Sequence, residues 1–485
     1  MDHRAIIIFG LIVAVAIATG CGSGEERKPT GAEPEKKAEQ NEKAEQPSEP
    51  EPEPPVPSGP NVVFFVLDTL RSDHTSLCGY ERPTTPNLAA LAEREGAKQT
   101  CGAVAPASWT LPSHASFFTA TDPVEHGAHS YTKGVKNLEG WGSATHNLGA
   151  DLPTLAEKMA ERGYQTVAIS SNPLISESLG LVRGFSKTAI SKKWGDMFGD
   201  AFIPAVKRAM EGVSRERPLF LFVNISDAHQ PWPAVPEGLD WVPARPANKY
   251  KKNLPDSDWR RYIEGKMKGK ERAGFLERIR DQYDHACFVA DRNFGRSLSF
   301  LQHGGWCDDD CRVVVVSDHG EFLGEHGLLD HGHYVWEEMV RVPLVTWGAA
   351  DDLELPEVIN AVHSFHLALD GRLPEKPEPV ASMSWPHVRR CAHTANDAFC
   401  STQAALWYGT EKLLYSDGKL FRIDLERDPG EKRPARLKKK HPHRAELEQL
   451  SGRVVADDWE KRNKAADGGT GDEIEEKLRA LGYLD

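Results

Sequence analysis

Two stretches decide the fold: NVVFFVLD at residues 61–68 and RVVVVSDHGE at residues 312–321. Each contains a continuous run of apolar residues, rich in β-branched and aromatic side chains, which is typical of a strand buried on both faces. Similar apolar runs occupy residues 166–169, 219–225 and 342–347. We therefore predict five buried strands, at residues 61–67, 166–169, 219–225, 312–316 and 342–347.

Helical patterns separate these strands. Apolar residues recur every three to four positions in residues 86–95, 155–162 and 275–301. The alternation of strands and helices predicts an α/β fold with a large, mostly parallel sheet that is wound on both faces. A length of 485 residues suits such a domain together with a smaller one.

Acidic and histidine side chains follow three of the predicted strands. In open α/β sheets the functional site lies beyond the carboxyl ends of the strands. A single Asp there is usually a turn residue or a helix cap, but metal-ligand residue types at three strand ends together predict a metal site. These residues are Asp68, Asp227 with His229, and Asp318 with His319.

The segment APASWTLPSHASFFTA at residues 105–120 combines hydroxyl groups with a helix start. Pro112 suits the first turn of a helix, so we expect Thr110 just before the helix N-terminus. Backbone N–H groups and the helix dipole favour an anion there, and a hydroxyl that touches a divalent cation can ionise near neutral pH. The spacing alone leaves two interpretations of Thr110 open, a nucleophile or an N-cap, and Ser108 or Ser113 would also serve as the cap.

The net charge of the chain is −13. Nucleic-acid binding needs clustered Lys and Arg, so this acidic balance argues against a nucleic-acid partner. A small anionic substrate stays allowed, because it meets only the local field of its site.

The N-terminus predicts export and anchoring. The apolar run Ala5–Ala18 is shorter than the roughly 20 residues of a membrane span, and the small residues before Cys21 look like a bacterial lipoprotein signal. We expect residues 1–21 to be the signal peptide, with Cys21 lipidated, and Gly22 favours the outer membrane if the host is Gram-negative. An uncleaved anchor helix is the alternative, and both place the remaining chain in the cell envelope. Residues 22–60, rich in Glu and Pro, are predicted to form a disordered tether.

Seven cysteines remain after lipidation of Cys21. In an oxidising compartment such as the periplasm, we expect disulfides that pair Cys307 with Cys311, Cys391 with Cys400, and Cys78 with Cys101. Cys287 lies in a helical pattern and is expected to be the odd, buried thiol. A zinc knuckle is the alternative, but no second CxxC-like pair accompanies either local pair.

From about Asn61 to Asp485, the chain resembles bacterial sulfatase-family proteins of the alkaline phosphatase superfamily. The motifs that carry this resemblance are LDTLRSDH (67–74), CGYERPTTPNLAALA (78–92), WTLPSHASFFTA (109–120), VVVVSDHGEFLGEHG (313–327) followed by RVPLV, KLFRIDLERDPGE (419–431) and the final EKLRALGYLD. The resemblance implies a catalytic domain at residues 61–375 and a small α+β subdomain at residues 376–485.

The resemblance also implies site roles. Asp68, Asp318 and His319 would bind a divalent metal ion together with Thr110, which stands at the nucleophile position. His229 and His331 would contact the anionic oxygens of the substrate or its leaving group. The implied partner is an ester of a small molecule, a glycan or a lipid headgroup, with membrane contact through the N-terminal lipid.

Several positions depart from the sulfatase pattern. Sulfatases carry Cys or Ser, converted to formylglycine, at the place of Thr110, and Thr cannot undergo that conversion. His114 replaces an Arg of the pattern, Asn172 stands with Ser171 in place of a Lys, and His331 replaces a second Lys. We therefore expect His114 and Asn172 to be substrate-binding residues. Thr69 replaces one of two paired aspartates.

Relatives with a Thr nucleophile act on phosphoryl groups, and they include nucleotide phosphodiesterases and phosphoethanolamine transferases. Their metal ligands resemble the set Asp68, Thr110, Asp318 and His319. A nitrogen ligand suits zinc or manganese better than calcium, which stays allowed. A second metal ion would use Asp227, His229 and His331.

These observations together predict a metal-dependent hydrolase of sulfate or phosphate esters that acts through a covalent Thr110 intermediate. The local chemistry favours phosphoesters. Two alternatives stay open: a phosphoethanolamine-type transferase, and a surface lipoprotein whose degraded site only binds a ligand.

Overall fold

The computed structural model describes residues 59–130, 145–233, 256–386 and 401–457, and the single residues 235, 239 and 241. The chain divides into two units, Met1–Pro54 and Pro55–Asp485, and the described residues all belong to the second. None of the helices formed by these residues is both long and apolar enough to cross a membrane. The predicted signal peptide, Cys21 and residues 22–58 of the predicted tether lie outside the described residues.

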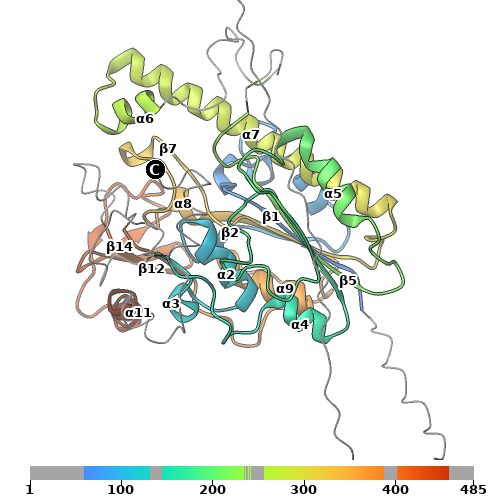
Figure 1. Cartoon of the computed structure of the whole chain (residues 1–485). Coiled ribbons are helices and arrows are strands. Elements are labelled where there is room, and N and C mark those ends of the chain that lie inside the picture. The colour runs from blue at the N-terminus through green and yellow to red at the C-terminus, as the bar shows by residue number, and fades with distance from the viewer. Residues whose placement is uncertain are drawn as a thin grey trace, which may run out of the picture. The chain divides into compact units, whose positions relative to one another are not determined.

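A mixed, mostly parallel sheet forms the centre of the fold (Figure 1). Strand β9 runs antiparallel to both of its neighbours, and every other pair in this sheet is parallel. The predicted α/β fold is confirmed. In spatial order, its strands are β10 (Ile359–Asn360), β2 (Lys98–Val104), β9 (Arg341–Trp347), β6 (Arg312–Val316), β1 (Val62–Leu67), β5 (Leu219–Ile225), β3 (Gln165–Ser170) and β4 (Lys187–Ile190).

Helices cover both faces of this sheet (Figure 1). Alternate residues of β1 point to opposite faces, so Phe64 belongs to one apolar cluster and Phe65 to the other. The Phe64 side carries α2 (Thr110–Thr119), α4 (Leu155–Glu161) and α9 (Ser364–Asp370). The Phe65 side carries α1 (Pro86–Ala92), α5 (Phe202–Met210) and α7 (Gly269–His303). Further helices are α3 (Pro123–His126), α6 (Asp256–Ile263) and α8 (Glu337–Val340).

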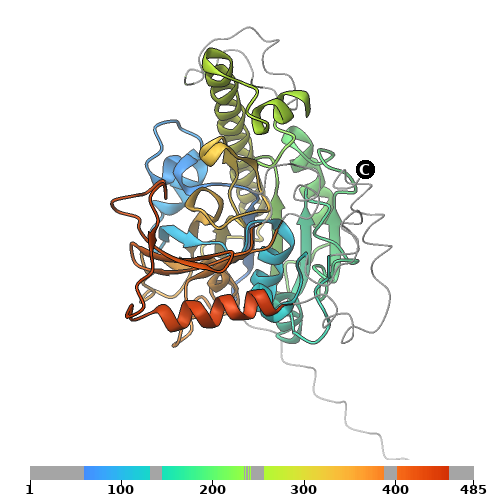
Figure 2. The same ribbon diagram turned by 90° about the vertical axis from the view of Figure 1, so that its left-hand side faces the viewer.

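A second, antiparallel sheet forms the smaller C-terminal subdomain (Figure 2). Its apolar face is covered by helix α11 (Arg444–Ala456), whose Leu447 and Val454 are buried against it. The small C-terminal subdomain implied by the resemblance is thus present. In order, its strands are β11 (Ala381–Ser384), β12 (Gln403–Tyr408), β13 (Glu411–Ser416), β14 (Lys419–Asp424) and β15 (Ala435–Arg436). A separate two-stranded sheet pairs β7 (Phe322–Leu323) with β8 (Leu329–Asp330).

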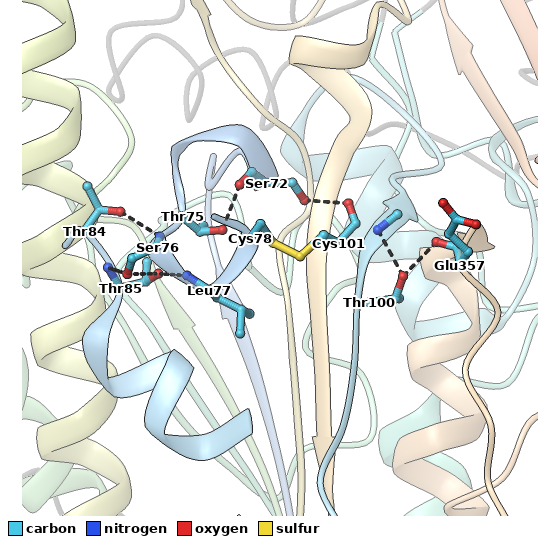
Figure 3. Close-up of a disulfide and its surroundings, with 11 residues drawn as sticks. Ser72, Thr75, Ser76, Leu77, Cys78, Thr84, Thr85, Thr100, Cys101 and Glu357 are labelled. Atoms are coloured by element: carbon cyan, nitrogen blue, oxygen red, sulfur yellow. Dashed lines mark hydrogen bonds between the residues drawn. A yellow bond between two sulfur atoms is a disulfide. The ribbon is translucent and has the colours of Figure 1, made fainter. Parts of the chain in front are cut away.

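Two of the expected disulfides are present. Cys78 is bonded to Cys101 and Cys307 to Cys311, while Cys287 is a buried free thiol. The first disulfide joins the turn after β1 to strand β2, beside a hydrogen bond from the Ser72 hydroxyl to the Cys101 carbonyl (Figure 3). Cys391 and Cys400 lie outside the described residues. Two disulfides are consistent with a compartment outside the cytoplasm.

Loop closure predicts how much each disulfide stabilises the fold. The Cys78–Cys101 bridge spans 23 positions and the Cys307–Cys311 bridge only 4. Replacing both cysteines of the longer bridge by Ser should lower the free energy of unfolding by ~3 kcal/mol. The same replacement at the shorter bridge should lower it by ~2 kcal/mol. Urea denaturation of the two double variants measures both values. The reverse order would contradict this account.

Candidate functional site

The carboxyl ends of the parallel strands bring the predicted metal ligands together. Asp68 follows β1, and Asp318 and His319 follow the neighbouring strand β6. All three side chains are fully buried. The Nε2 atom of His319 lies 3.7 Å from Asp68 Oδ1 and 3.5 Å from Asp318 Oδ2. In a tetrahedral site with metal–ligand distances of about 2.1 Å, ligand atoms stand about 3.4 Å apart, so this spacing fits one metal ion.

The hydrogen bonds of this triad leave three atoms for a metal. Asp68 uses Oδ2 to accept hydrogen bonds from Asn172 and Ser226, and Asp318 uses Oδ1 to accept one from the Thr69 amide. His319 donates its Nδ1 proton to the Gly320 carbonyl at 2.8 Å, which leaves a lone pair on Nε2. The remaining atoms, Asp68 Oδ1, Asp318 Oδ2 and His319 Nε2, accept no hydrogen bond from the described residues.

The electrostatics of the triad also fit a cation. Burial and the nearby Asp68 charge raise the pKa of Asp318 well above its usual range. Burial also opposes ionisation of Asp68, but His229, His319 and the Asn172 amide keep the pKa of that carboxyl below its usual value. Burial lowers the pKa of His319, so its ring is neutral at neutral pH. A divalent cation would balance two such carboxylates and bind the neutral ring.

Thr110 is the first residue of helix α2, which extends from the loop after β2. Its side chain is buried, and the Asn172 amide donates to its Oγ1 at 3.3 Å and to Asp68 Oδ2 at 2.7 Å. Asn172 thus links the candidate nucleophile to a candidate metal ligand. The N-cap residue is Trp109, which forms no side-chain cap. Among the described residues, the Thr110 hydroxyl accepts a hydrogen bond from Asn172 and none from a backbone N–H of α2.

His114 lies beneath Thr110 on the next turn of α2. Its Nδ1 donates to the Thr110 carbonyl at 2.9 Å and stands 3.4 Å from Asp318 Oδ2. Its Nε2 accepts a hydrogen bond from Asn224, and burial lowers the pKa of the ring to about 4. The ring is fully buried and neutral, and its contacts hold the backbone of Thr110 in place. Direct contact between His114 and substrate stays a prediction.

His229 and His331 stand edge to face, with ring centroids 4.7 Å apart. Burial lowers the pKa of His229, whose Nδ1 donates to the Gln230 carbonyl and whose Nε2 accepts no hydrogen bond from the described residues. The Nδ1 of His331 lies 3.2 Å from Glu321 Oε2 and 3.1 Å from Asp330 Oδ1. Together, Glu321, Asp330 and His331 form a second group of possible metal ligands.

Asp227 does not join either group. Its Oδ1 accepts a hydrogen bond from the Gly199 amide, and its Oδ2 accepts one from Asn293 on α7 at 2.8 Å. Among the described residues, Asp227 does not group with His229 and His331 as metal ligands, and Glu321 and Asp330 stand beside His331 instead. A residue that follows a strand can turn either into the site or toward the helix layer, and the sequence pattern does not distinguish the two.

Three side chains near the site were given no role by sequence reasoning. Glu321 was visible in the DHGE motif, but its contact with His331 depends on the fold of the following loop. Asn224 is a polar residue inside a buried apolar strand, a signal that could have found it. Trp194 stacks on His229 at 4.2 Å, and nothing in its local sequence pointed to the site.

Comparison with known proteins identifies the family of this chain. The family model described as Sulfatase matches residues 60–369, more than half of the chain. The chain belongs to the sulfatase family. This sulfatase-family chain is 22% identical over 366 residues to the N-acetylglucosamine-6-O-sulfatase of Bacteroides thetaiotaomicron. The match covers 59% of this chain and 62% of that protein, so it spans less than two thirds of the relative's length.

Solved structures share the fold at low sequence identity. The structure of BT4656 in complex with its substrate D-glucosamine-2-N,6-O-disulfate superposes with a TM-score of 0.56 and 19% identity, over 84% of this chain and 99% of that one. The phosphonate monoester hydrolase of Agrobacterium radiobacter gives a TM-score of 0.57 and 18% identity, over 82% and 95% of the two chains. Both likenesses concern the fold of this sulfatase-family protein.

The buried Asp227 generates a prediction about pH. Burial raises the pKa of Asp227 to about 6, from a model-peptide value of 3.8. The native state therefore holds the proton more tightly, and its stability falls as the pH rises from about 4 to 6. Asp227→Asn removes this dependence. The free energy of unfolding of the variant minus that of the native chain should therefore increase by ~2 kcal/mol from pH 4.5 to pH 7.5. Urea denaturation at both pH values checks this, and a constant difference between the two chains would contradict it.

Proposed function

We propose that this chain is a metal-dependent hydrolase of sulfate or phosphate esters that acts through a covalent Thr110 intermediate. The observation that carries the proposal is the connection of Thr110 to the unsatisfied metal-ligand triad. Asn172 bridges Thr110 Oγ1 and Asp68, while His114 bridges the Thr110 carbonyl and Asp318.

The proposed metal ligands are Asp68, Asp318, His319 and Thr110. A bound divalent cation would favour ionisation of the Thr110 hydroxyl and offset the negative charge of the ester. Mixed nitrogen and oxygen donors favour zinc or manganese, and calcium stays allowed. The Glu321 group allows a second ion, which a metal count will decide.

The proposed reaction has two steps. The deprotonated Thr110 Oγ attacks phosphorus or sulfur, the bond to the leaving oxygen breaks, and a histidine gives that oxygen a proton. Water then attacks the same centre and gives a proton to a histidine, while the bond to Thr110 Oγ breaks and Thr110 returns to its deprotonated form. The free N–H groups at the start of α2 would bind an ester oxygen throughout.

Of the two candidate proton donors, His331 is favoured. Its Nδ1 faces the carboxylates of Glu321 and Asp330, which stabilise a positive charge on the ring. His229 is buried and neutral, with Nδ1 directed at a carbonyl, so its Nε2 suits accepting a proton from water in the second step. Both rings would also contact the ester oxygens.

Local chemistry favours a phosphoester over a sulfate ester, because Thr110 cannot become formylglycine. The relatives leave both ester classes open: one acts on a sulfated glucosamine, and another is a phosphonate monoester hydrolase. A glycan or lipid-headgroup ester is therefore the proposed substrate class. We further propose that Cys21 anchors the enzyme in the cell envelope through a lipid.

Replacing Thr110 tests the nucleophile. Thr110→Ala should abolish turnover of aryl phosphate diesters and aryl sulfates, by at least roughly 10³-fold, because no other hydroxyl takes its place. Thr119→Ala, in the same helix, is the matched control: its hydroxyl only accepts and donates within the helix end and should be dispensable. Unchanged turnover in folded Thr110→Ala protein would refute the covalent mechanism.

Metal analysis tests the ligand set. Purified protein should contain stoichiometric zinc or manganese, and Asp318→Asn should lower metal affinity by roughly 100-fold or more. Asp227→Asn is the control from another strand end and should keep its metal, because both Asp227 oxygens are already hydrogen-bonded. Loss of metal in Asp227→Asn but not in Asp318→Asn would contradict the assignment.

The same measurements separate the alternatives. A phosphoethanolamine-type transferase would pass the group from Thr110 to an added alcohol faster than to water. A degraded, ligand-binding surface lipoprotein would contain no metal and turn over none of an aryl phosphate monoester, a phosphate diester and an aryl sulfate.

A further inference from the structure

The C-terminal sheet contacts the loops that carry two of the candidate catalytic residues, Thr110 and His331. Strand β11 forms a bridge between Met383 and Ala107, and the Met383 amide donates to the Pro106 carbonyl at 3.0 Å. The hydroxyls of Ser108 and Ser384 lie 3.3 Å apart. The nucleophile loop is therefore fixed to the C-terminal sheet two residues before Thr110.

The loop that carries His331 is held by neighbouring strands of the same sheet. Val335 donates its amide proton to Gln403 Oε1 of β12 at 3.0 Å, and its carbonyl accepts a hydrogen bond from Lys412 Nζ of β13 at 2.5 Å. Two residues later, the Glu337 amide donates to Glu431 Oε2 at 2.6 Å. Both backbone groups of Val335 thus bind side chains of the C-terminal sheet.

Two residues of this loop have left-handed backbone conformations. Tyr334, the residue before Val335, has a φ of 64°, and Asp330, the residue before His331, has a φ of 73°. The left-handed region is costly for a bulky side chain and persists only where the surrounding structure imposes it. In addition, the Gly332 amide donates to the Ser108 carbonyl at 2.8 Å, so the two loops are joined directly.

Lys412 is at the centre of this arrangement. Its side chain is fully buried, pairs with Glu431 at 2.7 Å and with Glu337 at 3.3 Å, and lies over the Trp407 ring. Burying an ammonium group costs free energy. We therefore expect Lys412, which lies between two carboxylates and a backbone carbonyl, to have a specific structural role. Its contacts converge on the short segment that follows His331 and His333.

We infer that the C-terminal sheet is the scaffold that sets the position of His331 relative to Thr110, and that Lys412 is a positioning residue for the reaction. This inference rests on the proposed function of Thr110 and His331. Lys412 touches neither the metal triad nor the candidate nucleophile, so it would act on the alignment of the histidine and leave metal binding intact.

The test uses the full chain and the variant Lys412→Met, which keeps the length of the side chain and removes its charge. Its kcat on an aryl phosphate diester should fall roughly tenfold to a hundredfold, with KM within about threefold, because misaligned groups slow chemistry more than binding. Its metal content should match that of the native chain. In addition, hydrogen exchange of the amides in residues 331–337 should speed up by roughly tenfold.

Two further variants guard against simple misfolding. Lys412→Met/Glu431→Gln removes both charges of the pair, so no buried carboxylate is left without its partner, and it should show the same fall in kcat. Leu447→Ala destabilises the same subdomain from helix α11, away from both loops, and should keep native kcat and native exchange in residues 331–337.

The outcomes are distinct. Native exchange in residues 331–337 of Lys412→Met overturns the inference, and so does an equal loss of kcat in Leu447→Ala. If the native chain hydrolyses no ester, the proposed function fails, and the exchange measurement still decides whether Lys412 holds the loop.

Discussion

Two carboxylates, Asp68 and Asp318, are buried beside each other at the ends of adjacent strands, and the rest of the site is arranged around their charge. Burying one unpaired carboxylate is costly, and burying two close together is costlier still. The chain supplies hydrogen bonds from Asn172, Ser226 and the Thr69 amide to one oxygen of each. These bonds orient the other two oxygens toward His319, where a cation would offset both charges.

Most of the central sheet could be predicted from sequence because its strands are buried on both faces. The predicted runs at 219–225 and 312–316 coincide with β5 and β6, and the others differ from β1, β3 and β9 by one or two residues. Strand β2 was missed because its sequence, KQTCGAV, is half exposed and contains no apolar run. The reversal of β9 was also invisible, since an apolar run carries no direction.

The grouping of Asp68, Asp318 and His319 could be predicted for the same reason that the sheet could. Parallel strands end at one edge, so residues just after them must meet there. The substitutions at His114 and Asn172 were recognised, but their contacts were not: both groups lie behind Thr110 and reach toward Asp318 and Asp68. Asp227 shows the limit of the argument. It also follows a strand, but its carboxylate accepts a hydrogen bond from Asn293 on helix α7. The roles of all these residues stay predictions until activity and metal are measured.

The position of His331 is determined by different contacts from those of Asp68, Asp318 and His319. This difference explains why the C-terminal sheet is important for the site. The triad is fixed by strand register, whereas His331 lies in a long connection from β6 to the antiparallel strand β9. Such a connection crosses the carboxyl edge of the sheet without strand hydrogen bonds of its own, apart from the short β7–β8 pair. Its conformation therefore depends on other contacts: Arg71 and Tyr262 bind the carbonyls of Glu321 and Gly324, and Gln403 and Lys412 bind Val335. Residues 61–375 contain Asp68, Asp318 and His319, but they lack Gln403 and Lys412, which bind both backbone groups of Val335.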